Sequence, residues 1–146
     1  MPVRPAELAQ LVTDHLVTQT FSQAASVSRA SRPRVDRAAL EGPVITVVPR
    51  SAEDTLSSRA TVARDIEIDV AIQARLTAQP HDARDAEIDQ LMQIVSEVGD
   101  ALRGVNLPNA QWRLQRNDPI YAPEHLDQHA VFTSLIPVTY RTALMI

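Results

Sequence analysis

The sequence of 146 residues has no cysteine, all of its 14 basic residues are arginine, and it has only three glycines. The missing cysteine excludes disulfides, thiolate metal ligands and thiol catalysis. The missing lysine excludes Schiff-base chemistry and a P-loop lysine. So few glycines leave no phosphate-binding glycine loop and no dinucleotide fingerprint, and no serine stands in a Gly-x-Ser-x-Gly elbow. The sequence therefore gives little support to nucleotide-binding or nucleophilic enzymes.

Long apolar runs are also missing, and the segment after Met1 has no stretch like that of a signal peptide. Aromatic residues make up 3% of the chain, so the core must be built mostly from Val, Ile, Leu and Ala. The apolar fraction of 45% and charged fraction of 22% are ordinary for a globular domain. A net charge of −4 does not favour a dedicated nucleic-acid binder. We expect one domain over residues 1–146, made and used in the cytoplasm or built into something that is assembled there.

Two segments have the apolar period of amphipathic helices. The first covers about 5–19 and the second about 85–102. Strand patterns cover about 21–30, 43–49, 66–76, 110–115 and 130–144, whereas 51–58 and 117–128 are polar and predict loops. Pro137 cannot donate to a ladder, so it predicts an edge or a bulge in the last strand. This order predicts an α+β fold: a mostly antiparallel sheet of about five strands over 21–144, covered on one face by two helices.

Three carboxylates, Asp65, Glu67 and Asp69, alternate along one face of the clearest strand. Same-face neighbours on a strand lie about 7 Å apart, which is too far for most shared metal coordination without other ligands. The main prediction is an acidic stripe that faces solvent or a partner. No cofactor is predicted.

Four arginines, Arg29, Arg32, Arg34 and Arg37, surround Pro33 and form the only basic cluster. It is either a solvated loop or a contact surface for an acidic partner or phosphates. An acidic stripe and a basic cluster on one small chain suit head-to-tail contacts between copies, which close into a ring when the rotation permits.

A second interpretation is a small metal-dependent hydrolase. His125 and His129 are four residues apart, a spacing that places two zinc ligands on one helix face, and the acidic strand could add carboxylates. Pro123 just before them and the strand after them argue against a helix at this point. A bacterial adaptor domain remains a third possibility.

Four stretches of sequence carry a family resemblance: TFSQAASVSRASRPRVDRAALEGPVITVVP, ARDIEIDVAIQARL, DAEIDQLMQIVSEVGDAL and IYAPEHLDQHAVFTSLIPVTYRTAL. The most specific parts are Val47-Val48-Pro49 after the Arg-Pro loop, and Tyr121-Ala122-Pro123-Glu124 leading into Phe132-Thr133-Ser134. From about Thr20 to Leu144 the chain resembles small neck proteins of tailed bacteriophages, most of all the tail terminator or tail-completion group.

The resemblance implies an α+β subunit of a homohexameric ring that caps the head-proximal end of the tail tube and ends its polymerisation. It implies contacts with the tail tube protein and with the head-tail connector or stopper, and genome DNA passing through the ring without sequence-specific binding. It implies no catalysis, no cofactor and no membrane. Another connector or head-completion protein of the neck is the alternative within this class. From charge alone, the interface candidates are the carboxylates Asp65, Glu67 and Asp69 and the arginines Arg29, Arg32, Arg34 and Arg37.

Overall fold

A computed structural model describes residues 3–30, 42–77, 81–124, 126 and 130–145. Its elements in chain order are α1 (Pro5–Val17), β1 (Ser26–Arg29), β2 (Val44–Leu56), β3 (Thr61–Arg75), α2 (His81–Leu102), β4 (Gln111–Gln115) and β5 (Val131–Met145). The strands form one sheet in the order β1-β2-β3-β5-β4. Only the β1–β2 pair is parallel. The predicted α+β class and mostly antiparallel sheet are confirmed.

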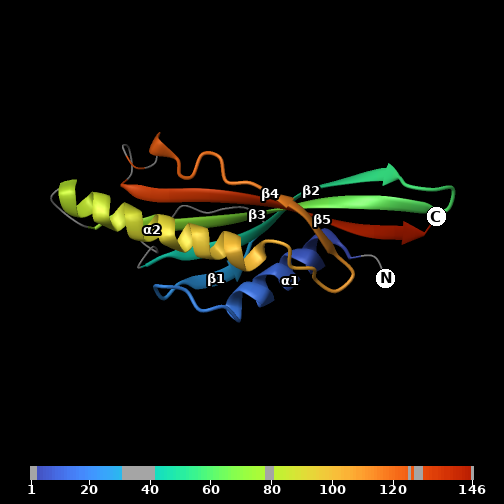
Figure 1. The fold of residues 1–146 in the computed structure, drawn as a ribbon, viewed down its shortest axis with the longest axis horizontal. Helices are drawn as coiled ribbons and strands as arrows, with labels where there is room; N and C mark the ends of the chain where they lie inside the picture. Colours follow the sequence, from blue (N-terminus) through green and yellow to red (C-terminus); the bar gives the residue numbers. More distant parts are fainter. Residues whose placement is uncertain (1–2, 31–41, 78–80, 125, 127–129, 146) are drawn as a thin grey trace.

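The two helices pack their apolar stripes against one face of the sheet, here called the helix face (Figure 1). Pro5 opens α1, where its missing N–H has no partner inside a helix. The stripe of α1 buries Leu8, Val12 and Leu16, as its 3.6-residue period predicts. His15 Nε2 lies 2.9 Å from the carbonyl oxygen of Ala101, a contact that ties α1 to the end of α2. His15 is thus a half-buried structural residue.

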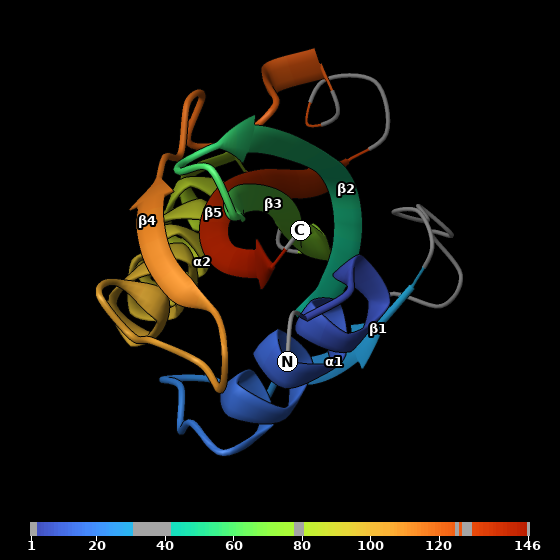
Figure 2. The ribbon, with the colours of Figure 1, turned by 90° about the vertical axis from the view of Figure 1, so that its right-hand side faces the viewer.

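The predicted alternation of β3 is confirmed on the helix face. Ile66, Ile68, Val70 and Ile72 are fully buried there, and β5 adds Phe132 and Tyr140 to the same core. The other face, here called the outer face, carries the residues in between, from Asp65 to Gln73. Viewed along the long axis, the sheet is strongly curled (Figure 2).

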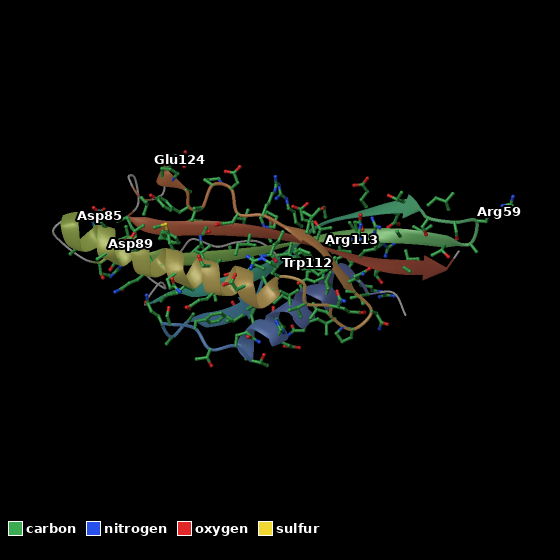
Figure 3. The ribbon with its side chains drawn as sticks, in the orientation of Figure 1. Arg59, Asp85, Asp89, Trp112, Arg113 and Glu124 are labelled. Carbon is green, nitrogen blue, oxygen red and sulfur yellow. The ribbon has the colours of Figure 1, made fainter. Side chains whose placement is uncertain are left out.

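Beyond the helices, three strands continue as a narrow ribbon, here called the extension (Figure 1). It consists of residues 51–65, which form the end of β2, the turn and the start of β3, together with residues 141–145 of β5. Residues 51–60 are all exposed. The turn is closed by the N–H groups of Ser57 and Ser58, which donate to the carbonyl oxygen of Thr61 at 3.0 and 3.1 Å. Arg59 lies at the tip (Figure 3).

The extension corrects the prediction of a loop over 51–58, because β2 runs to Leu56. The polar sequence gave no strand pattern since neither face of this part of β2 is packed, and pairing with β3 holds it extended. The predicted strand over 21–30 is also too long: β1 begins at Ser26.

The last strand is not at an edge, since β5 lies between β3 and β4. Pro137 is tolerated for a local reason: its carbonyl oxygen accepts from Arg116 N at 3.2 Å, just past the end of β4. N–H and C=O of one strand residue point the same way, so the missing N–H of Pro137 also faces this side, where no ladder partner is required.

Candidate interaction surface

The three predicted carboxylates lie on the outer face of β3, and the structure gives each of them an arginine partner. Asp65 is opposite Arg141 of β5 in the sheet register. Arg141 donates from Nε to Oδ1 at 2.8 Å and from Nη2 to Oδ2 at 3.1 Å. The hydrogen bonds from Arg141 hold the pKa of Asp65 below its usual range, and the nearby charge of Arg113 acts in the same direction. Asp65 is therefore held as a carboxylate in a two-bonded pair.

Glu67 and Asp69 share a second arginine, which comes from an irregularity in β2. The register of β2 against β3 shifts between Pro49 and Ser51, so Arg50 is an extra residue in the strand. Its Nη1 lies 3.5 Å from a carboxylate oxygen of Glu67 and 3.5 Å from one of Asp69. Both contacts are longer than tight charge-assisted hydrogen bonds.

Asp69 differs electrostatically from Asp65 because it is buried. Burial raises the pKa of Asp69, and the weaker attraction of Arg50 only partly opposes this shift. The acidic stripe is thus largely neutralised within the chain, which sequence reasoning did not foresee.

Of the four arginines in the predicted basic cluster, Arg29 is described and Arg32, Arg34 and Arg37 lie outside the described residues. Arg29 is exposed at the end of β1, opposite Val47, which belongs to the helix face. The carboxylates lie on the outer face, so the structure does not bring Arg29 and the acidic stripe together within one chain. Contact between them in neighbouring copies stays a prediction.

The possible metal ligands do not converge in the part of the chain that the structure describes. Within it, no three His, Asp or Glu side chains are grouped so that they could hold a metal ion. Since His125 and His129 fall outside the described residues, the structure does not test the zinc hypothesis.

The outer face is also partly covered, which the sequence did not reveal. Past the end of β4, residues 116–122 run beside β5, where Ala122 N donates to the carbonyl oxygen of Thr133 at 2.8 Å. Ala71 and Gln73 are each 1% exposed under this segment. A cavity of about 370 Å³ remains between the segment and the sheet, and Arg50 and Arg116 are among the residues that line it.

The other feature that sequence reasoning missed is two strand edges whose outward backbone groups have no described neighbouring strand, here called the β2 flank and the β5 flank. The bonds between β1 and β2 end where Ala30 N donates to the carbonyl oxygen of Val47 at 3.0 Å, so β2 beyond Pro49 has no described neighbour on that side. On the other side of the sheet, β4 reaches only Arg141 of β5. Pro49 was the available signal for the β2 flank, because a proline inside a strand marks a side without a ladder partner; the β5 flank beyond Arg141 had no such signal.

Fold and surface together define a small α+β protein with a helix-covered body, a strand extension that runs beyond the helices and paired charges on its outer face. None of the described helices is long and apolar enough to cross a membrane. No protein-family model and no curated protein matches the sequence. Among solved structures, the chain is similar to one from a structure described as "Virion of native gene transfer agent (GTA) particle". The TM-score is 0.54 at 13% identity, and the match covers 95% of each chain, so the two share a fold.

Proposed function

We propose that this chain is a structural, non-catalytic component of a phage-like virion. The observation that carries the proposal is the fold shared with a virion chain along 95% of both chains. The paired charges of the outer face are consistent with this role, because they form an ordered polar surface.

Within the particle, we propose the neck as its place and the tail terminator as its role. There the chain forms a homohexameric ring on the head-proximal end of the tail tube, contacts the tube protein and the head-tail connector, and lets DNA pass. The family resemblance of the sequence supports this finer assignment. A different connector or head-completion protein is the alternative within the same class.

Deletion of the chain in particle-producing cells tests the assignment. A tail terminator predicts tails of uncontrolled length that fail to join heads, and re-expression of the wild-type chain restores normal particles. Filled heads that leak DNA with tails of normal length would instead identify a head-completion protein. Particles of normal form and infectivity or transfer activity would contradict a structural role in the virion.

The ring is tested by light scattering on the purified protein across a concentration series. A species of six subunits that dissociates as salt rises indicates a ring held partly by charged contacts. A monomer at all concentrations moves the test to isolated tail tubes, where binding at one end only is expected. Binding along the whole tube, or none, would contradict the terminator role.

A further inference from the structure

We propose that copies of this chain join edge to edge through the extension, with the β2 flank of one copy against the β5 flank of the next. The proposal rests on the ring proposed above and names its interface. It replaces the charged faces predicted from the sequence with two backbone edges.

The first observation is the direction of unpaired backbone groups on β2. The backbone groups of Val47 face away from β3, since its carbonyl oxygen accepts from Ala30 N, just past the end of β1. Arg50 is an extra residue in β2, so it shifts by one residue the alternation of backbone groups that face β3 and groups that face away from it. Beyond Arg50, the N–H and C=O groups of Ala52, Asp54 and Leu56 therefore face outward. This flank offers three residues with N–H and C=O groups that have no partner strand in the described part of the chain.

The second observation is the opposite flank of the same ribbon. The carbonyl oxygens of Thr133 and Pro137 accept bonds on the side away from β3, so the odd-numbered residues of β5 face outward. Ala143 and Met145 continue this series beyond the last residue that β4 reaches. Two open flanks on opposite sides of one ribbon are what head-to-tail pairing requires.

Charge favours a second copy of this chain as the occupant. Glu53 lies on the β2 side of the ribbon and Arg113 of β4 lies on the β5 side, whereas Asp54 and Arg141 are already paired within the chain with Arg64 and Asp65. Glu53 and Arg113 form no ion pair among the described residues. The carboxylate of Glu53 in one copy thus lies on the side where the next copy presents the guanidinium of Arg113. Because β2 and β5 run the same way, this pairing is parallel and places the same sheet face of both copies on one side.

Proline provides a selective test of the β2 flank. Ala52→Pro removes an N–H that faces outward and breaks no bond to β3, just as Pro49 does naturally. We expect Ala52→Pro to abolish self-association at concentrations where the control Ala52→Ser still assembles, with circular dichroism unchanged. Ala143→Pro against Ala143→Ser tests the other flank in the same way. Proline variants that fold and assemble like their serine controls would overturn the proposal.

Because the chain has no cysteine, introduced cysteines permit a second test by disulfide cross-linking, which removes no backbone hydrogen-bond donor. Thr55 and Ala143 are exposed on the outer face, one near each flank. On oxidation, the double variant Thr55→Cys with Ala143→Cys should give a ladder of cross-linked species up to the full ring. The matched control joins Thr55→Cys with Asp89→Cys on the exposed side of α2, and should not give one.

The cross-linking is done in solution and in isolated particles. Absence of a ladder in both, or dimers from Thr55→Cys alone at the same yield, would overturn the edge pairing. Mass spectrometry of the same particles reports separately whether the chain is a virion component. A chain that is present but not cross-linked contradicts only the interface, whereas its absence contradicts the proposed function.

Discussion

The strands β2, β3 and β5 pass through two regions that differ in what covers them. In the body, Ile45, Ile72 and Phe132 are fully buried between the sheet and the helices. In the extension, Leu56 is 67% exposed, and the exposed Asp54 meets the half-buried Arg64 across the ribbon. The same three strands therefore form for different reasons: burial of apolar area holds the body, and interstrand bonds and a turn hold the extension.

This difference separates folding from assembly. Since the body contains the apolar core, substitutions there should act on the free energy of unfolding. The exposed part of the extension, residues 51–60, contributes no buried side chain and presents unpaired backbone groups on β2, so substitutions there should act on contacts with other chains. The predictions below test this separation, beginning with the largest expected effect.

Ile72→Ala should be strongly destabilising, because Ile72 is fully buried in β3 on the helix face. Loss of its methyl and methylene groups leaves a cavity, at a cost of about 2–5 kcal/mol in the free energy of unfolding. Denaturant unfolding followed by circular dichroism measures this change. The control Ile72→Val should cost about 0.5–1.5 kcal/mol. Equal effects of the two variants would show that the body is not tightly packed.

Gln115→Ala tests a polar contact of the body. Its Nε2 donates to the carbonyl oxygen of Gly99 at 2.9 Å, and its Oε1 accepts from Trp112 Nε1 at 3.0 Å, so it joins β4 to α2. The half-buried position predicts a loss of about 1–2 kcal/mol in the free energy of unfolding. Gln111→Ala, on the exposed part of the same strand, is the control and should be near neutral. A loss of similar size for Gln111→Ala would contradict this account.

The pKa values of Asp65 and Asp69 are shifted in opposite directions, so the two carboxyl groups predict opposite effects of pH on stability. Asp65 has a lowered pKa, so its pair with Arg141 stabilises the fold fully above the ordinary carboxyl pKa and is lost as pH falls through the lowered value. Asp69 has a raised pKa, so stability falls as pH rises from the ordinary value through the raised one. At neutral pH, Asp65→Asn should lower the melting temperature, and Asp69→Asn should leave it unchanged or raise it.

Thermal unfolding over a pH series checks this pair of variants. Asparagine resembles the protonated carboxyl, so both variants should approach the wild type in acid. High salt should reduce the effect of Asp65→Asn, because the pair with Arg141 is partly exposed. A lower melting temperature for Asp69→Asn than for Asp65→Asn at neutral pH would contradict the assigned causes of the two pKa shifts.

Sequence reasoning succeeded where local periodicity reports burial. The stripe of α1 and the alternation of β3 both follow from the core they face. It failed over Ser51–Leu56, where no core imposes a pattern. It also missed the arginine partners of the acidic stripe, since Arg141 lies 76 positions from Asp65 and Arg50 is placed by a shift in register. Such contacts depend on strand pairing, which no local pattern encodes.

Leu56→Ala is the smallest expected effect on folding and the sharpest test of the separation between body and extension. The side chain is 67% exposed, so its truncation should change the free energy of unfolding by no more than about 0.5 kcal/mol. Leu56 nevertheless lies on the open flank of β2, where an apolar side chain buried between copies would strengthen association. We therefore expect unchanged unfolding of the dilute protein and weaker self-association by light scattering. If Leu56→Ala instead unfolds the protein as readily as a core substitution, the extension belongs to the folding unit, and the difference between the two regions is one of exposure alone.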